Sequence, residues 1–349
     1  MVGLDSYEVP QKERAHSLTA TYLSTGDHDV IIVGTAIQKA PGEEPQEGRI
    51  LTFMINPQRK LQLISQTPVP GCVYSMDFVD GKLVATVNGM TCLYQWSKSE
   101  NDATFAWRHL HSHFGQILGV KIDVRGNLVA VGDLMKSVNL LSVSDGKLTE
   151  LARDYDSNWM TEVHFISEDE ILGSDNLGNL FVLSCQRDEN FIANRSDLSI
   201  KSAFHIGEVV NRISKGTLAR NQDLDREGIH GAVLHDPLII CTTAGSIYQF
   251  GKISLKYARP LKILESNLVK LLPPIGGLSH ADWRRMVTER KKLKEVDTFI
   301  DGDMIARYLE LDHTKQRIAC EGGLESCDPT GLSTDQITSA VEVLVSLNQ

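Results

Sequence analysis

Three histidines in the run His109-Leu110-His111-Ser112-His113 have the spacing that most resembles a chemical site. If this run is a β-strand, alternate residues point to one side, so the three imidazoles would share one face. Histidines spaced in this way can bind zinc, but a catalytic zinc needs a third converging ligand and an open position. Neighbours on one strand do not converge without a second segment, and no acidic motif nearby completes a set. We therefore expect no metal here and interpret the run as the polar face of an outer strand.

Other reactive residues are scattered without motif spacing. His313, Cys320 and Cys327 form a weaker candidate for a metal site. The run Asp145-Gly146-Lys147-Leu148 lacks the preceding glycine and the Ser or Thr of a phosphate-binding loop, and no G-x-S-x-G elbow occurs. The sequence therefore predicts a protein that is not an enzyme and needs no cofactor. A metal-dependent enzyme built on the strand 109–113 is the alternative.

The charge of the chain bears on its partners. It carries 35 basic and 45 acidic residues, a formal net charge of −10. Proteins that grip nucleic acid neutralise phosphates with a basic surface, so we expect nucleic acid to be bound at most indirectly, through partners. One dense basic cluster comprises Arg284-Arg285, Arg290-Lys291-Lys292 and Lys294. It is interpreted as a nuclear-import signal or a patch for acidic partners, with a solvated helix face as the alternative.

Cysteine usage and hydropathy indicate the compartment. No C-x-x-C pair occurs among the six cysteines, and four of them lie in apolar, strand-like runs, so we expect free thiols in a reducing compartment. The N-terminus does not resemble a secretory signal, and no segment approaches ~20 consecutive apolar residues. We expect a soluble protein of the nucleus, also present in the cytoplasm, with no membrane partner.

A repeated unit of strands runs through residues 1–256. Each unit has a short apolar strand that ends in small residues, a second strand after a turn, and a further strand upstream. The small-ended strands begin at residues 31, 83, 128, 171 and 238, so they are 52, 45, 43 and 67 residues apart. Four strands in every ~40–50 residues are typical of a β-propeller blade. Polar insertions at residues 39–49 and between 187 and 236 account for the two long spacings.

Five units raise a problem of closure. Five blades alone would leave edge strands unpaired, or would need an unusually tight ring. Either sequence that is missing here completes the ring, or the propeller is small and unusual.

The hydrophobic period changes to a helical one after about Lys256. Residues Pro260 to Leu272 predict a helix with leucines along one face. Ser279 is expected to cap a second helix that carries Trp283 and Val287, and Asp301 a third. The run Ser333-Thr334-Asp335-Gln336 is a capping box that opens a last amphipathic helix.

Several runs resemble one known family. They are Gly132-Asp133-Leu134-Met135-Lys136-Ser137-Val138, Ala152-Arg153-Asp154-Tyr155, Asn158-Trp159-Met160, Phe204-His205-Ile206-Gly207-Glu208, Trp283-Arg284 with Thr288-Glu289-Arg290-Lys291, and Phe299-Ile300-Asp301-Gly302-Asp303. In this order they resemble the C-terminal part of the damaged-DNA-binding protein 1 family, adaptor subunits of cullin-RING ubiquitin ligases. The sister families are the large subunits of the cleavage and polyadenylation specificity factor and of splicing factor 3b. They share the Ile-Asp-Gly-Asp run, whereas Trp-Arg with Thr-Glu-Arg-Lys favours the damage adaptor.

The resemblance implies an architecture. Members of the family have three propellers before a helical tail; the third has seven blades and forms a receptor-binding cleft with the first, and the second binds the cullin. This chain is then mainly β: a partial propeller with about five of seven blades in residues 1–256, followed by a small α-helical C-terminal domain in residues 257–349. Missing blades or upstream propellers would be supplied by the full-length chain, and the cullin-docking surface would be absent.

The resemblance also implies partner-binding residues, which are Leu118, Val120, Arg153, Trp159, Val209 and Asn211. A large, rigid Trp159 is the kind of side chain found at binding hot spots, and Arg153 could add a forked, charge-assisted contact. The alternatives are a blade-packing role for Trp159 and a solvated loop charge for Arg153. Leu118 and Val120 depart from the family pattern, which leaves the choice of receptor open.

These observations predict a protein-interaction scaffold. The leading hypothesis is an adaptor that binds substrate-receptor proteins of a cullin-RING ubiquitin ligase linked to DNA repair. The alternative is an RNA-processing scaffold of the polyadenylation-factor or splicing-factor 3b type.

Overall fold

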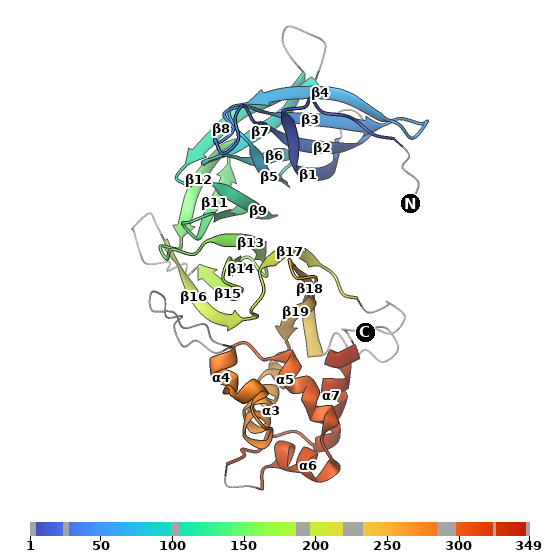
Figure 1. Ribbon diagram of the computed structural model, residues 1–349, viewed down its shortest axis with the longest axis vertical. Helices are drawn as coiled ribbons and strands as arrows, with labels where there is room; N and C mark the ends of the chain where they lie inside the picture. Colours follow the sequence, from blue (N-terminus) through green and yellow to red (C-terminus); the bar gives the residue numbers. More distant parts are fainter. Residues whose placement is uncertain are drawn as a thin grey trace. The chain divides into compact units, whose positions relative to one another are not determined.

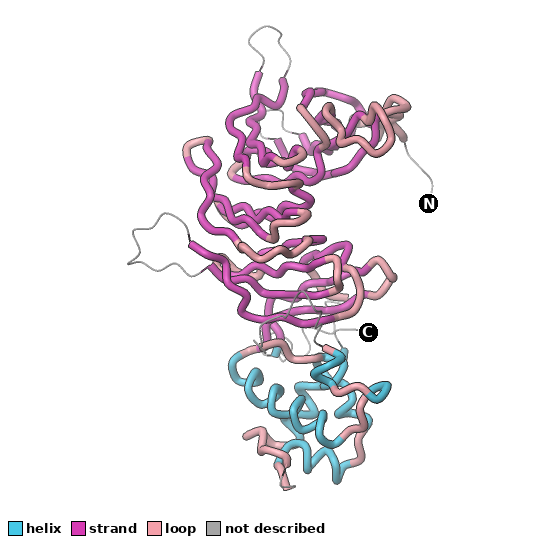
Figure 2. The backbone as a smooth tube through the Cα atoms, turned by 60° about the vertical axis from the view of Figure 1, so that its left-hand side comes forward, coloured by secondary structure: helices cyan, strands magenta, loops and turns pink. Residues whose placement is uncertain are grey.

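The computed structural model describes residues 5–23, 28–98, 105–185, 196–218, 233–284, 298–323 and 326–346. Strands dominate up to residue 253, and the helices follow (Figures 1 and 2). The strands are β1 Glu13–Leu23, β2 His28–Ile37, β3 Gly48–Ile55, β4 Leu61–Val69, β5 Val73–Val79, β6 Lys82–Val87, β7 Met90–Lys98, β8 Phe105–Phe114, β9 Gly119–Arg125, β10 Leu128–Asp133, β11 Val138–Ser144, β12 Lys147–Arg153, β13 Met160–Phe165, β14 Glu170–Asp175, β15 Asn179–Cys185, β16 Ser196–His205, β17 Val210–Lys215, β18 Leu234–Thr242 and β19 Ile247–Ile253.

The strands form blades of consecutive antiparallel neighbours. β1–β4 and β5–β8 are four-stranded sheets, and β17–β19 is a three-stranded sheet. β9–β12 and β13–β16 are two further blades that join into one eight-stranded sheet, because β12 pairs in parallel with β16 at Ala152↔Ser196. This propeller-like arrangement confirms the mainly β fold and the five strand units predicted from the spacing.

Close packing between neighbouring blades explains the small residues that end the repeated strands. Gly34 lies at the end of such a strand in β2, and a Cβ there would lie 2.6 Å from Cγ1 of Val73, the first residue of β5. Apolar side chains of the first two blades form one core, including Ile32, Ile50 and Val73. The next core lies between the β5–β8 and β9–β12 blades. Space is therefore limited by the adjacent blade.

The first helix begins five residues earlier than predicted, at Leu255 instead of Pro260. The elements of the helical part are α3 Leu255–Leu271, η1 Ile275–Gly277, α4 His280–Trp283, α5 Gly302–Ala306, η2 Arg307–Glu310, α6 His313–Glu321 and α7 Thr334–Ser346. The predicted start of α3 at Pro260 is wrong, because this proline lies inside the helix, where it is buried. Burial of Leu261, Leu264 and Leu268 against the other helices offsets the backbone hydrogen bond that a proline cannot donate.

The predicted helix caps can be followed one by one. Ser279 Oγ accepts from Asp282 N–H at 3.1 Å, and Asp301 Oδ1 accepts from Asp303 N–H at 3.0 Å. Ser333 and Gln336 form both bonds of the capping box, at 3.3 and 3.1 Å. Residue 287, expected in the second helix, lies outside the described residues. These local signals are confirmed, whereas α6 has no counterpart among the predicted helices.

Contacts divide the chain into two compact units. Unit 1 comprises Met1–Asn176 and Val182–Ser199, and unit 2 comprises Leu177–Phe181 and Ile200–Gln349. The last blade, β17–β19, thus belongs with the helices. The predicted division into domains at 256/257 stays a prediction, although the change from strand to helix occurs at Leu255.

Candidate protein-binding rim

Three loops meet at one end of the β9–β12 blade in unit 1. They are residues 114–118, from the last residue of β8 to the start of β9, residues 134–137 between β10 and β11, and residues 154–159 after β12. Antiparallel pairing places them together, since Asp133 at the end of β10 pairs with Gly119 at the start of β9, and Asn139 near the start of β11 pairs with Arg153 at the end of β12. We call these three loops the rim; they follow β8, β10 and β12 along the chain (Figure 1).

The rim exposes an unusual number of large apolar side chains. Phe114 is 69% exposed and Trp159 is 45% exposed. The full set of exposed large hydrophobic residues on the three loops is Phe114, Ile117, Leu134, Met135, Tyr155 and Trp159. Single exposed hydrophobic residues are normal on a protein surface, but a concentration on adjacent loops marks an interaction site.

A buried carboxylate fixes two of the loops. The Asp133 side chain accepts four backbone N–H groups: Oδ2 accepts from Ile117 at 2.6 Å and Leu118 at 3.2 Å, and Oδ1 accepts from Met135 and Lys136, each at 2.8 Å. Leu134 N–H also donates to the carbonyl of Leu118 at 2.9 Å. Hydrogen bonds to a charged acceptor are stronger than neutral ones, so Asp133 gives both loops a fixed conformation.

A second carboxylate fixes the third loop. Asp154 is buried, and its side chain accepts from Ser137 Oγ, from Asn158 Nδ2 at 3.1 Å and from Asp156 N–H at 3.1 Å. Burial raises the pKa of Asp154, and the bond from Ser137 opposes that rise. Ser137 N–H donates to the carbonyl of Asn158 at 3.0 Å. Tyr155 and Trp159 are therefore presented by an anchored loop.

Arg153 lies beneath the rim in a polar network. Its Nη2 donates to Glu150 Oε2 at 2.7 Å, and its Nη1 donates to the carbonyl of Gly115 at 3.2 Å. Glu150 also accepts from Asn139 Nδ2 at 3.2 Å and lies 3.4 Å from His113 Nε2. Burial raises the pKa of Glu150, but the hydrogen bond and the charge of Arg153 lower it by more, so the net shift of this pKa is downward. Burial lowers the pKa of His113, and Arg153 adds to this while Glu150 opposes it.

The structure places four of the six predicted partner-binding residues at or beside the rim. Trp159 is exposed on it, so it is not a buried blade-packing residue, and Leu118 ends the first loop. Val120 is the extra residue of a β-bulge in β9, since Asp133 pairs with Gly119 and Gly132 with Lys121. Arg153 is neither solvated nor on a loop: it ends β12 and is 16% exposed. Partner binding by all four stays a prediction.

The other two predicted residues belong to unit 2 and are not brought into this site. Val209 precedes β17, and its carbonyl accepts from Thr243 N–H at 2.9 Å. Asn211 is exposed on β17. Their role in partner binding also stays a prediction.

The three histidines of β8 do not share one face, contrary to the sequence interpretation. A register shift pairs His111 with Leu93 and His109 with Tyr94, which leaves Leu110 as an extra residue. His109 Nε2 lies 2.8 Å from Ser112 Oγ, and His111 Nδ1 accepts from Leu148 N–H at 3.3 Å. In the described part of the chain, no three His, Cys, Asp or Glu side chains are placed to share a metal ion. All six cysteines are free thiols, as expected.

Unit 2 contains a second cluster built from the recognised runs. Arg284 donates to Asp301 from Nε at 2.6 Å and from Nη2 at 3.1 Å, and to Asp303 at 2.8 Å. Its guanidinium lies 3.6 Å from the centre of the Trp283 ring and 4.8 Å from that of Phe204. This cluster joins β16, α4 and α5, so the Trp-Arg and Ile-Asp-Gly-Asp runs are structural. The rest of the predicted basic cluster, residues 285–294, lies outside the described residues.

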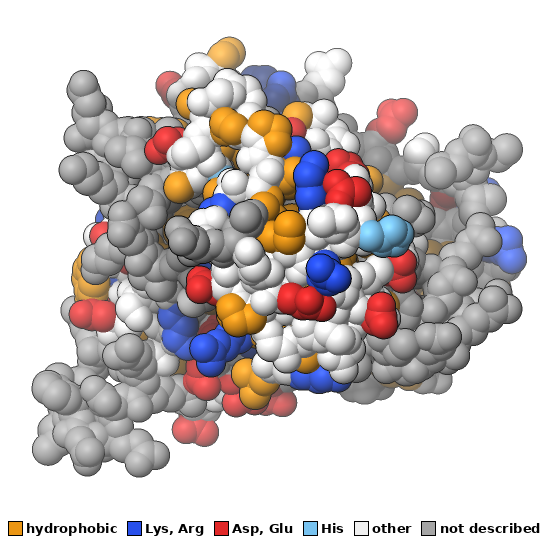
Figure 3. All heavy atoms as spheres, turned by 90° about the horizontal axis from the view of Figure 1, so that it is seen from below, with side chains coloured by type: hydrophobic (Ala, Val, Ile, Leu, Met, Phe, Trp, Pro, Cys, Tyr) orange, Lys and Arg blue, Asp and Glu red, His pale blue; other side chains and the backbone are white. Residues whose placement is uncertain are grey.

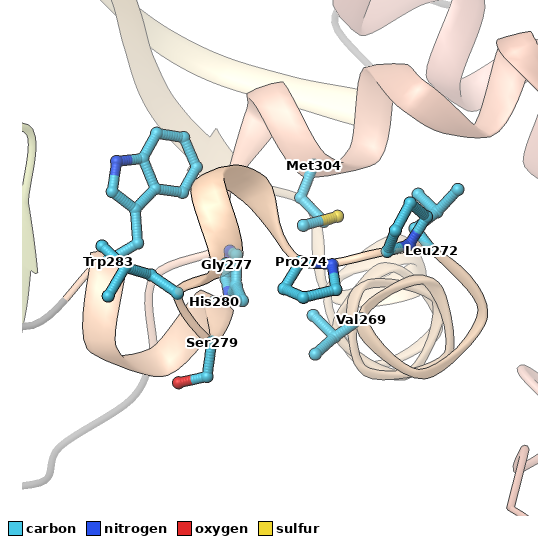
Figure 4. A pocket seen from close by; sticks show the side chains of 10 residues that line it. Val269, Leu272, Pro274, Gly277, Ser279, His280, Trp283 and Met304 are labelled. Carbon is cyan, nitrogen blue, oxygen red and sulfur yellow. The ribbon is translucent and has the colours of Figure 1, made fainter.

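A pocket of about 370 Å³ lies beside this cluster (Figure 4). The side chains that line it are mostly apolar, and they include Leu272, Pro274, Trp283 and Met304. His280, also in the wall, is tied by Nε2 to Asp301 at 2.9 Å. Convergent polar groups of the kind that orient a substrate are few among these residues.

The face shown in Figure 3 has no patch of a single charge sign among its coloured residues. On the face shown in Figure 3, acidic, basic and hydrophobic side chains are interspersed among the coloured residues. Within the described helices, none is long and apolar enough to cross a membrane.

Sequence reasoning missed most of the apolar rim. It singled out Trp159 but not Phe114, Ile117, Leu134, Met135 or Tyr155. One signal was available: Leu134, Met135 and Tyr155 stand in the recognised runs just past the end of a strand, where a core residue is not needed.

Comparison with known proteins agrees with this architecture. The model of the family described as the CPSF A subunit region matches residues 2–310. The chain is 33% identical over 315 residues to DNA damage-binding protein 1 of Solanum lycopersicum, covering 89% of this chain and 28% of that protein. It is 34% identical over 322 residues to DNA damage-binding protein 1b of Arabidopsis thaliana, covering 91% and 29%. For DNA damage-binding protein 1 of Oryza sativa subsp. japonica the identity is 32% over 347 residues, covering 99% and 30%.

The chain thus spans less than a third of the length of these relatives. Its blades, helical part and recognised runs all lie within or overlap the matched region. On the extent of this match, the chain belongs to the family of the CPSF A subunit region.

Proposed function

We propose that this protein is a non-catalytic scaffold and that partner proteins dock on the rim of the β9–β12 blade. One observation carries the proposal: six large apolar side chains are exposed on three loops that buried polar groups hold in place. Aromatic and apolar residues on a preorganised surface bind partners well, because little conformational freedom is lost on association.

The proposed partners are substrate-receptor proteins of a cullin-RING ubiquitin ligase that acts in DNA repair. The similarity to DNA damage-binding proteins supports a role in damage-related processes. Since the chain matches less than a third of those relatives, we assign receptor binding to it and leave cullin binding to other regions of such proteins. We place the protein in the nucleus and also the cytoplasm, and we propose that nucleic acid is reached through partners, as a net charge of −10 favours.

A second candidate function is an RNA-processing scaffold. It is favoured by the matching family model, whose description names a CPSF subunit. Affinity purification of the tagged chain separates the two: ubiquitin-ligase receptors support the first function, and polyadenylation or splicing subunits support the second.

The rim itself is tested by Trp159→Ala. With the partner recovered in that purification, the variant should bind at least ~30-fold more weakly, the scale of a binding hot spot. Leu18→Ala is the matched control, because Leu18 is another exposed apolar residue of unit 1, at 70%, and it lies away from the rim, on β1. Equal affinities of the two variants, with unchanged circular dichroism, would rule out the rim as the docking surface.

A further inference from the structure

Both Nη atoms of the Arg153 guanidinium are engaged inside the molecule. Its two Nη atoms donate to Glu150 and to the Gly115 carbonyl, and the side chain is only 16% exposed. Glu150 is 14% exposed and also accepts from Asn139. A partner carboxylate that bound Arg153 would have to displace Glu150. Separating a largely buried ion pair leaves one poorly solvated charge behind, which is strongly unfavourable.

The contact with Gly115 ties Arg153 to the rim. Lys136 Nζ donates to the same carbonyl at 3.2 Å, so two cations hold the loop that carries Phe114 and Ile117. Gly115 has φ of +150°, and a Cβ there would lie 2.7 Å from Arg153 Nη2. A side chain at position 115 would therefore have to displace the Arg153 guanidinium, so the loop backbone and Arg153 pack directly against each other.

The rim has no excess of exposed charge of either sign that would serve as an ionic anchor. Asp133 and Asp154 are buried and receive several hydrogen bonds each. On the three loops, whose residues are all described, the exposed charged side chains are Lys136 and Asp156, one of each sign. The surface of the rim is thus nearly neutral and carries six exposed apolar side chains.

We propose that Arg153 is a positioning residue of the rim rather than a contact, and that the rim takes a partner segment presenting aliphatic and aromatic side chains without an acidic anchor. This rests on the proposed function, because it specifies the chemistry of the partner at that same surface. Arg153 acts through Gly115 on the loop 114–118, and the partner binds the apolar side chains that this loop exposes.

Glu150→Gln separates positioning from direct contact, because the two predict opposite signs. If Arg153 contacted an acidic partner, release from Glu150 would strengthen binding and make it more sensitive to salt. If Arg153 positions the loop, the weakened pair lets the loop move, and the dissociation constant should rise about tenfold with an unchanged dependence on NaCl between 50 and 500 mM. Arg153→Lys should behave like Glu150→Gln, since a lysine cannot make both bonds in the same geometry.

The probe is the purified partner whose recovery depends on Trp159, and binding is measured by isothermal calorimetry. Amide hydrogen exchange of the free chain supplies a second readout: Ile117 and Leu118 should exchange faster in Glu150→Gln and Arg153→Lys, but not in Trp159→Ala. If no partner depends on Trp159, the proposed function fails, whereas the exchange data still test positioning. Tighter, salt-sensitive binding by Glu150→Gln, or unchanged exchange at Ile117 and Leu118, overturns the positioning role.

Discussion

The buried ion pair of unit 2 allows a sharp test of stability, and Asp301→Asn is the change that isolates it. The Asp301 carboxylate is 2% exposed and has two roles: it accepts from Arg284 and His280, and it caps α5. Asparagine has the same shape and is an equally good N-cap. The substitution therefore removes the negative charge while it keeps the cap.

The expected loss follows from the burial of Arg284. This side chain is 9% exposed, and its remaining acidic partner is Asp303, which is 66% exposed. Breaking a buried pair by removing one partner costs about 3 kcal/mol or more of unfolding free energy, because the other charge stays behind. Cation–π contacts with Trp283 and Phe204 persist and do not replace a counter-charge.

Urea unfolding followed by circular dichroism at the helix band provides the assay, since all described α-helices belong to unit 2. The matched control is Asp312→Asn, which also keeps an N-cap, on α6, but breaks only an exposed ion pair with Lys315. The control should unfold at the wild-type urea concentration. If Asp301→Asn does so too, the account of the cluster is refuted.

The pH dependence of the same cluster gives a second readout. Burial raises the pKa of Asp301, but hydrogen bonds from His280 and Arg284 lower it by more, so the net direction is down from 3.8. A carboxylate with a lowered pKa contributes stability above its unfolded pKa and loses it as the pH falls. The difference in unfolding free energy between the wild type and Asp301→Asn should therefore become smaller below about pH 4.

Three further outcomes are expected. Gly34→Ala should lower the unfolding free energy of unit 1 by ~1–3 kcal/mol in urea titration, because its Cβ would overlap Val73; an unchanged midpoint would contradict tight packing between blades. Burial raises the pKa of Cys72 to about 11, with partial opposition from Tyr74, so iodoacetamide at pH 8 should label it only after urea is added. Burial lowers the pKa of His113 below 6.5, so stability should fall as the pH drops from 7 through 6.5 and below, and less so in His113→Gln; parallel pH profiles would argue against a buried neutral imidazole.

Period and local capping chemistry carried most of the fold prediction. The small-ended strand predicted to begin at residue 128 is β10, which begins at Leu128, and the three cap residues Ser279, Asp301 and Ser333 all begin helices. These features depend on a few neighbouring residues, so the sequence contains them. The start of α3 was missed because proline weakens a helix locally, whereas the packing of Leu264 and its neighbours that stabilises this one is tertiary.

The site was harder to predict for the same reason. Nothing adjacent in sequence shows that Arg153 reaches the carbonyl of Gly115, 38 residues away, or that Asp133 collects amides from a loop 15 residues before it. The bulge at Leu110, which places His109 on the opposite face from His111 and His113, also depends on pairing with β7. Residue types indicated which side chains could do chemistry, and only the pairing of strands determines what each one meets.

In this geometry the residues of the recognised runs have two distinct roles. Asp133, Asp154 and Arg153 are buried or nearly so and hold loops, whereas Leu134, Met135 and Tyr155 within the same runs are exposed. Positioning and contact are thus carried by different residues only one or two positions apart. Because the hydrogen bonds run mainly to backbone N–H and carbonyl groups, the apolar contacts can be exchanged without disturbing the loops that present them. A scaffold built in this way can change its partner by changing exposed side chains while its blade stays the same.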